Sequence, residues 1–258
     1  MTTPPGTKWI TPMITVISRL SGGMTIHDQA KFAELFPIDD KHVVGVMTCP
    51  GGKCASDKTL SITKRGFSTH KDRKRAFPRV VTFRFCPYTE NPNMLPCLRL
   101  SNNGMCHITG TNNIVVANRV MDILMSVLKT TQFPPGVVSF GDLDKGYNSE
   151  IKLINSLVLL EDRVTLDHFV EMMLRSREAK KLECPNHTKL LLVATGIKMS
   201  CLLDKVTQRI KLQVFGAKSV SALDDVKAII AKVLLSCRIV DTKDVYSIEK
   251  APQELVLF

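Results

Sequence analysis

The order of hydrophobic patterns in the first half of the chain recurs in the second half. Residues 13–20 alternate between apolar and polar positions, which is typical of a strand, and residues 28–35 favour a short helix. The same pair of patterns returns at 151–160 and 165–175, where Thr165 is placed to cap the helix. In each half, three further strand-like segments and a long amphipathic helix follow. We therefore predict that each half folds as strand, short helix, three strands and long helix.

This internal repeat predicts an α+β fold with two copies of one unit. A single copy would leave one sheet face and one apolar helix stripe exposed, so we expect the two copies to share a continuous sheet. The predicted boundaries are a first repeat at 9–130, a linker at 131–149, a second repeat at 150–238 and a C-terminal tail at 239–258. A basic insertion at 41–75 interrupts the first repeat.

The charge of the chain indicates a polyanionic partner. Lys and Arg number 35 against 24 Asp and Glu, which gives a formal net charge of +11. Each Lys or Arg placed on a phosphate releases condensed counterions, so this excess favours nucleic acid, although it also keeps proteins soluble. The basic tract of the insertion has three candidate roles beside that of a solvated loop: gripping phosphates, nuclear localisation and contact with an acidic partner. The basic tract consists of Lys53, Lys58, Lys64, Arg65, Lys71, Arg73, Lys74 and Arg75.

Motifs for catalysis are missing from the sequence, so we expect no enzyme, no cofactor and no small-molecule substrate. There is no P-loop, no G-x-S-x-G, no H-E-x-x-H and no dinucleotide-binding fingerprint. No apolar run approaches the roughly 20 residues that span a bilayer, and the N-terminal segment is polar. We therefore expect an intracellular protein that does not enter membranes.

Two groups of cysteines suggest different environments. Cys49 and Cys54 flank Pro-Gly-Gly-Lys, a spacing that lets two thiolates face one metal ion. Structural zinc needs four ligands and no second pair is evident, so we assign no metal ligands, and zinc binding and a plain turn both stay open. Four other cysteines lie in apolar stretches and are expected to be small, reduced core residues. These are Cys86, Cys106, Cys201 and Cys237.

Two strand ends resemble a paired motif of TATA-box-binding proteins. Segments 108–110 (Ile-Thr-Gly) and 215–218 (Phe-Gly-Ala-Lys) are similar to the T-G-A-K strand ends of that family. Residues 151–157 resemble the first strand of the family's second repeat. The resemblance spans 13–130 and 150–237 and thus most of the chain. The divergence and the insertion suggest a nucleocytoplasmic large DNA virus as the source.

The resemblance implies a saddle: an α+β fold in which two pseudo-repeats form a curved antiparallel β-sheet with helices on the convex face. The concave face of such a saddle contacts A·T-rich double-stranded DNA in the minor groove, where both orientations of an A·T pair present only acceptors. The resemblance implies a transcription initiation factor whose helices recruit RNA polymerase subunits or another general transcription factor, in the host nucleus or a cytoplasmic viral factory. Two alternatives stay open. One is a protein-interaction platform of the same fold with weak or no TATA-specific DNA binding, and the other is a basic nucleic-acid chaperone with sequence-independent binding.

The resemblance also assigns residues to the DNA face. Asn155 matches a central asparagine that donates to adenine N3 and thymine O2, and Thr15 stands at its counterpart position in the first repeat. The family's wedges between base steps match Phe77 and Leu100 in the first repeat and Leu203 in the second. The alternative for Asn155 is a hydrogen bond to the backbone, and the alternative for the three wedge positions is a place in the core or on the sheet face.

Further contact positions follow from the same resemblance. Thr109 keeps a family threonine at a strand end, where Phe215 stands in the second repeat. Arg84 and Lys211 match basic positions that contact phosphates, with solvated side chains as the alternative. The apolar positions that line the groove are Ile17, Leu157, Ile108 and Val214. Because the second repeat keeps fewer family residues, weak or altered TATA specificity is expected.

Overall fold

The computed structural model describes residues 7–39, 41–48, 60–63, 79–160, 164–184, 188–203 and 209–248. Contacts divide the chain into two compact units. The first unit contains residues 13–153, and the second unit contains residues 1–12 and 154–258. Two long strands, β1 (Thr7–Leu20) and β9 (Tyr147–Leu160), cross this division, so each unit holds one part of both strands.

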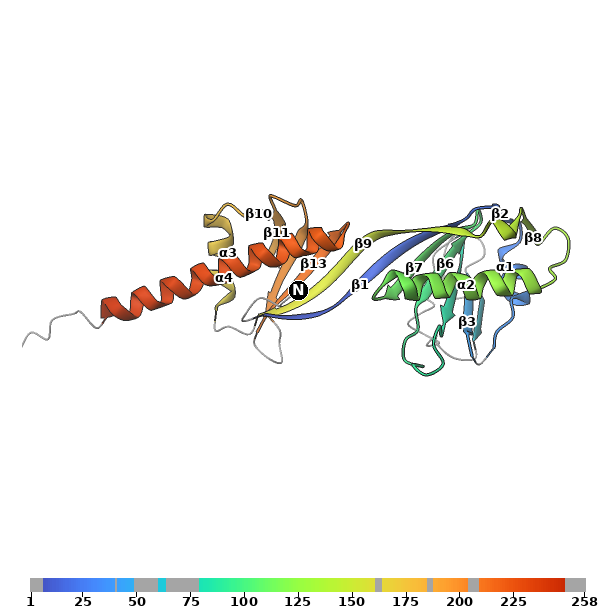
Figure 1. Ribbon diagram of the computed structural model, residues 1–258, viewed down its shortest axis with the longest axis horizontal. Coiled ribbons are helices and arrows are strands. Elements are labelled where there is room, and N and C mark those ends of the chain that lie inside the picture. The colour runs from blue at the N-terminus through green and yellow to red at the C-terminus, as the bar shows by residue number, and fades with distance from the viewer. Residues whose placement is uncertain are drawn as a thin grey trace, which may run out of the picture. The chain divides into compact units, whose positions relative to one another are not determined.

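The first unit is built on an antiparallel sheet (Figure 1). Its other elements are β2 (Met24–Ile26), α1 (Gln29–Leu35), β3 (Val43–Thr48), β4 (Leu60–Thr63), β5 (Val80–Phe85), β6 (Cys97–Ser101), β7 (Met105–Thr111), α2 (Ile114–Thr130), β8 (Val138–Phe140) and a 3₁₀ turn (Leu143–Lys145). The strand order is β1–β7–β6–β5–β3–β4. β9 lies beside β1, where the hydroxyl oxygens of Ser18 and Ser149 are 2.7 Å apart, and β2 pairs with β8.

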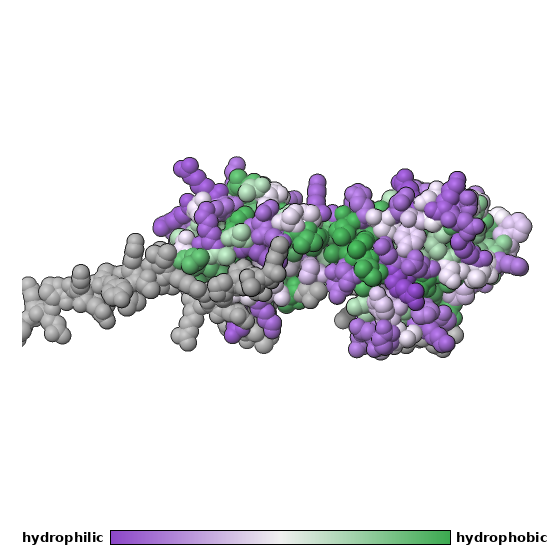
Figure 2. Space-filling model, in the orientation of Figure 1, coloured by the Kyte–Doolittle hydropathy of each residue, from purple (hydrophilic) through white to green (hydrophobic). Residues whose placement is uncertain are grey.

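Helices α1 and α2 pack on one side of this sheet. Asp28 caps α1 and Asn113 caps α2, because each side-chain oxygen accepts a hydrogen bond from the backbone N–H three residues on. The apolar stripe of α2 is buried, while Figure 2 shows mostly hydrophilic side chains over its outer side. Under α1, Phe36 and Phe83 have ring centroids 4.6 Å apart and form part of an aromatic core.

Two glycines are required by a close approach of the chain within the first unit. A Cβ atom on Gly22 would lie 1.9 Å from the carbonyl oxygen of Asp142, and one on Gly141 would lie 1.9 Å from that of Gly22. Both distances are far below van der Waals contact. The turn after β1 therefore packs on the segment after β8 only with glycine at both positions.

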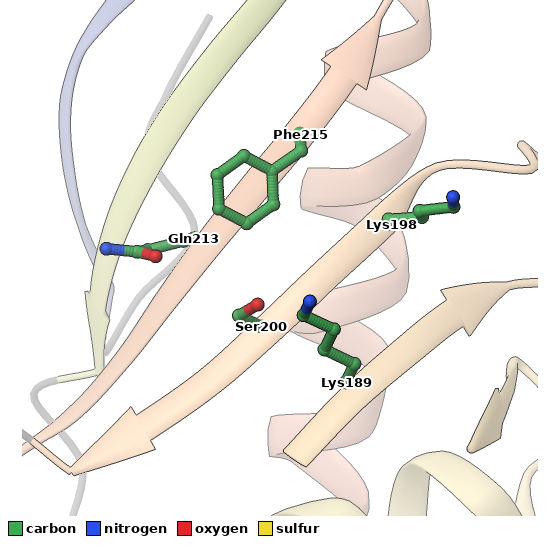
Figure 3. A pocket seen from close by; sticks show the side chains of 5 residues that line it. All are labelled: Lys189, Lys198, Ser200, Gln213 and Phe215. Atoms are coloured by element: carbon green, nitrogen blue, oxygen red, sulfur yellow. The ribbon is translucent and has the colours of Figure 1, made fainter. Parts of the chain in front are cut away.

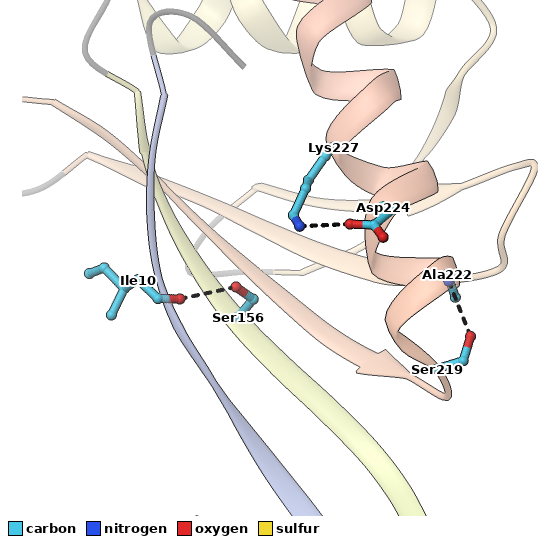
Figure 4. A network of polar contacts seen from close by, with 6 residues as sticks. All are labelled: Ile10, Ser156, Ser219, Ala222, Asp224 and Lys227. Carbon is cyan, nitrogen blue, oxygen red and sulfur yellow. Dashed lines mark hydrogen bonds and ion pairs between the residues drawn. The ribbon is translucent and has the colours of Figure 1, made fainter. Parts of the chain in front are cut away.

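The strands of the second unit are also antiparallel. Its other elements are α3 (Leu166–Arg175), β10 (Ala179–Leu182), β11 (Thr188–Leu192), β12 (Lys198–Leu203), β13 (Ile210–Ala217) and α4 (Val220–Ile248). The strand order is β10–β11–β12–β13–β9. β1 lies beside β9, where the hydroxyl of Ser156 donates to the carbonyl oxygen of Ile10 at 3.4 Å (Figure 4).

Helices α3 and α4 pack on one side of the second sheet, with α3 against β10 and β12 and α4 against β13. Ser219 caps α4 by accepting a hydrogen bond from the Ala222 N–H at 3.1 Å, and Lys227 pairs with Asp224 at 2.7 Å (Figure 4). The Lys227 ammonium also lies 5.3 Å from the ring centroid of Trp9, which belongs to the same unit. The cap and the ion pair stabilise the first turns of α4, and the contact between Lys227 and Trp9 joins them to β1.

Most element types predicted from the sequence agree with the described part of the structure, which is mostly antiparallel sheet with four α-helices. Thr165 caps α3, as predicted, by accepting from the His168 N–H. Within the predicted insertion, β3 coincides with a strand-like run at 42–49, and β4 pairs with it at the end of the sheet. The predicted linker contains β8 and the start of β9, and α4 continues into the predicted tail as far as Ile248. The repeat boundaries and the saddle stay predictions.

Candidate nucleic-acid interface

Each sheet has a second side on which no described helix packs, and we call it the open face. Along β7, Cys106 and Ile108 are buried toward the helices, whereas His107 and Thr109 lie on the opposite side and are half-buried. The same alternation runs along β13. It follows from the two-residue period of a strand, which sends successive side chains to opposite faces.

The open face of the first unit carries two rows of side chains. The first row is Ile17, His107, Arg99 and Thr82, and the second row is Thr109, Cys97 and Arg84. Burial and the nearby Arg99 lower the pKa of His107, so its imidazole is neutral at pH 7 and offers one donor and one acceptor. Arg84 Nη1 donates to the carbonyl oxygen of Leu95 at 3.0 Å, which ties this guanidinium to the chain.

The open face of the second unit has the same layout with different chemistry. Its first row is Leu157, Gln213, Ser200 and Lys189, and its second row is Phe215, Lys198 and Leu191. Lys211 lies on the same face, between Leu202 and Leu159. This face therefore combines one exposed lysine, Lys198, and two half-buried lysines with apolar side chains and one aromatic ring.

A bulge of the same kind interrupts both sheets. Thr15 of β1 and Asn155 of β9 lie at the two register shifts, opposite Gly110 and Gly216. These glycines have φ of 80° and 82°, a region that favours glycine. The side-chain oxygen of Asn155 accepts a hydrogen bond from the Gly216 N–H at 3.2 Å. This bond identifies which amide atom is the oxygen and leaves the Nδ2 group as a donor for a ligand.

Acidic residues are almost absent from the strands. The described strands contain one acid, Glu150, which pairs with Lys152 at 2.5 Å. They contain ten basic residues: Lys8, Arg19, Arg84, Arg99, Lys152, Lys180, Lys181, Lys189, Lys198 and Lys211. Lys and Glu are both depleted in strands to a similar extent, so strand propensity alone does not explain why basic residues outnumber acidic residues in these strands. The separation gives both sheets a positive potential that attracts phosphates.

Several residues predicted to contact DNA lie on the open faces. They are Thr15, Ile17, Thr109 and Arg84 in the first unit and Asn155, Leu157 and Lys211 in the second, and of these Thr15 is buried at its bulge. The structure brings them together on sheet faces, and their contact with DNA stays a prediction. Phe77, Cys49, Cys54 and the basic tract lie outside the described residues.

Three residues predicted to contact DNA lie in the core instead. Leu100, Ile108 and Val214 are fully buried on the helix side, so their side chains do not reach the open face. A shift of one residue along a strand moves a side chain to the other face, and open-face neighbours such as Arg99 take their place as candidates. Leu203 is 48% exposed at the end of β12, but its pairing places it on the helix side as well.

Three open-face residues received no role from the sequence: Lys189, Lys198 and Ser200. Their strands are short and largely apolar, so period-two alternation was the only available signal. Cross-strand pairing brings them beside Gln213 and Phe215, and pairing of this kind depends on a register that the sequence does not show.

The cysteines predicted for the core are buried. Burial raises the pKa of Cys106 and Cys201 to about 12, so both thiols stay protonated and unreactive. In the described part of the chain, no group of three or more His, Cys, Asp or Glu side chains is arranged to hold a metal ion. Among the described helices, none has the length and apolar character that crossing a membrane requires.

Comparisons with known proteins find similarity in structure only. No protein-family model matches the chain, and no curated protein matches it in sequence. The solved structure of Methanococcus jannaschii TBP is 11% identical, with a TM-score of 0.45, and the match covers 88% of this chain and 99% of that one. A rolling-circle replication initiator protein from Geobacillus stearothermophilus is 10% identical, with a TM-score of 0.31, and the match covers 88% of this chain and 80% of that one. Both TM-scores lie below 0.5, and neither match decides between functions.

Proposed function

We propose that this chain binds double-stranded DNA in the minor groove through the open faces of its two units and acts in transcription initiation. The separation of charge carries the proposal: the described strands hold ten basic residues and one acid, which is paired. A sheet face without unpaired carboxylates approaches the phosphates on either side of a groove without repulsion. The resemblance to TATA-box-binding proteins supports the same reading and supplies the role in initiation.

The chemistry of the open faces favours A·T-rich DNA. Both orientations of an A·T pair present only acceptors in the minor groove, so a single donor suits either orientation. The Nδ2 group of Asn155 is such a donor, because Oδ1 is held by the Gly216 N–H. Ile17 and Leu157 pair with His107 and Gln213 at matching places and supply apolar contact beside it. Guanine adds an N2 donor to this groove. This donor would face the Nδ2 donor of Asn155, and two donors cannot form a hydrogen bond with each other.

The helix side supports recruitment of a protein partner. Its helices carry acids, such as Asp122 on α2, Glu171 on α3 and Asp224 on α4, interspersed with basic residues. A surface of mixed charge suits electrostatic complementarity with another protein rather than with a polyanion. RNA polymerase subunits or a general transcription factor are the partners that the resemblance implies.

A titration over a salt series tests the DNA-binding proposal. We expect an A·T-rich duplex to bind in fluorescence anisotropy, with log K falling linearly against log[salt] between about 50 and 200 mM. Replacing one phosphate-contacting lysine, as in Lys211→Gln, should reduce the slope by about 1. Arg119→Gln on α2 removes the same charge from an exposed position on the helix side and should leave the slope unchanged.

The same titration separates the alternatives. Absence of binding at the lowest salt contradicts direct DNA recognition and favours the protein-interaction platform. Equal affinity for A·T-rich and G·C-rich duplexes with a steep slope contradicts minor-groove selection and favours a sequence-independent chaperone.

A further inference from the structure

A pocket of about 340 Å³ lies on the open face of the second unit (Figure 3). Five side chains from three neighbouring strands line it: Lys189 from β11, Lys198 and Ser200 from β12, and Gln213 and Phe215 from β13. Ser200 pairs with both Lys189 and Gln213, and Lys198 pairs with Phe215. Paired strands of one unit therefore hold all five residues in fixed register.

An aromatic ring forms one wall of this pocket. Phe215 is 41% exposed, although its strand neighbours Val214 and Ala217 are fully buried. A nucleobase of any identity stacks on such a ring, because every base has a π-face. At the matching position of the first unit stands Thr109, with Cys97 as its cross-strand partner. Of the two open faces, the second alone has an aromatic ring at this position.

Two lysines line the pocket with the ring. Among the described residues, neither Lys189 nor Lys198 forms an ion pair, and no carboxylate lines the pocket. Ammonium groups beside an aromatic ring select a ligand that is both flat and anionic. A nucleotide within a strand has this combination, since its base stacks while its phosphates bind the lysines.

Hydrogen-bonding groups complete the lining. Ser200 and Gln213 lie side by side, and within the described chain neither side chain bonds to another protein group. A hydroxyl and an amide offer donors and acceptors to the Watson–Crick edge of a base. In a duplex this edge is paired and both faces of the base are covered by neighbours. The pocket therefore fits a base that has left the stack.

We propose that this pocket holds one unpaired base of single-stranded DNA, stacked on Phe215, with the flanking phosphates on Lys189 and Lys198. The proposal rests on the DNA-binding function proposed above, which supplies the choice of DNA over RNA. It adds a site for a strand that has separated from the duplex.

The test uses the full chain and a short oligodeoxythymidine strand that carries one 2-aminopurine, whose fluorescence reports stacking. Phe215→Leu keeps an apolar side chain and removes the ring, whereas Phe215→Trp keeps a ring. We expect Phe215→Leu to weaken single-strand binding about 10-fold and to abolish the fluorescence change. Phe215→Trp should retain both, and Phe215→Leu should weaken binding of an A·T-rich duplex less than it weakens single-strand binding.

Each other outcome overturns a defined part of the proposal. If Phe215→Leu binds single strands as tightly as the native chain does, the pocket does not bind DNA. If the native chain still binds the duplex in that case, the proposed function is not contradicted. An equal loss for single strand and duplex shows that the ring serves the duplex. Tighter binding of the matching RNA strand overturns the choice of DNA. If the native chain binds neither single strand nor duplex, the proposed function fails together with the pocket.

Discussion

Asn155→Asp is expected to weaken binding of an A·T-rich duplex by about 10- to 100-fold. The substitution exchanges the Nδ2 donor for a carboxylate oxygen, which faces the acceptors N3 and O2 and the phosphates beyond them. The fold is preserved, because a carboxylate oxygen still accepts the hydrogen bond that Asn155 Oδ1 now receives from the Gly216 N–H at 3.2 Å. Fluorescence anisotropy at fixed salt measures the change.

A charge-matched variant separates recognition from simple repulsion. Arg119→Gln also lowers the net charge by one, but at an exposed position of α2 on the helix side. Its affinity for the duplex should equal that of the native chain. Similar losses for the two variants would mean that net charge, rather than the donor at the bulge, controls binding.

Phe83→Ala is expected to lower the free energy of unfolding by about 3–5 kcal/mol. The Phe83 ring is fully buried, with ring centroids 4.6 Å from Phe36 and 6.0 Å from Phe85. Its removal leaves a cavity in the aromatic core under α1. Typical domains unfold at a cost of about 5–15 kcal/mol, so this variant loses a large fraction of its stability. Urea denaturation followed by circular dichroism measures the loss.

Phe140→Ala is the control for this core prediction. Phe140 belongs to the same unit, but it is only half-buried, and its nearest ring partner, Phe133, lies 6.0 Å away. We expect a loss of about 1 kcal/mol, which is ordinary for a partly exposed position. Equal losses at the two positions would contradict the placement of the core on the helix side of β5.

The elements that sequence periodicity predicts well are those with a one-sided apolar pattern. The apolar stripe of α2 and the alternation in β7 and β13 each fit only one type and orientation of element, because only one face of the element is buried. The Thr165 cap was equally visible, since capping depends on residues adjacent in sequence. Strand β3, which lies between β5 and β4, carries no such alternation, because all six of its residues are buried.

The candidate site was less predictable, because strand register decides which side chains share a face. The family resemblance places 108–110 and 215–218 at strand ends, but it does not show which side chains face the helices, and Leu100 and Val214 are buried on that side. A one-residue error reverses every assignment in a strand. The pocket around Phe215 was hidden for the same reason, since it needs the pairing of Lys198 across a hairpin.

Three duplexes of one length test the central claim of minor-groove recognition most directly. They carry the same central site as A·T pairs, as G·C pairs, or as inosine·cytosine pairs. Inosine keeps the major-groove groups of guanine and lacks its N2 amino group, so an inosine·cytosine pair resembles A·T in the minor groove alone. The proposed contact of the open faces predicts that the inosine duplex binds with the affinity of the A·T duplex and more tightly than the G·C duplex. An inosine duplex that binds with the affinity of the G·C duplex, while the A·T duplex binds more tightly, would contradict it.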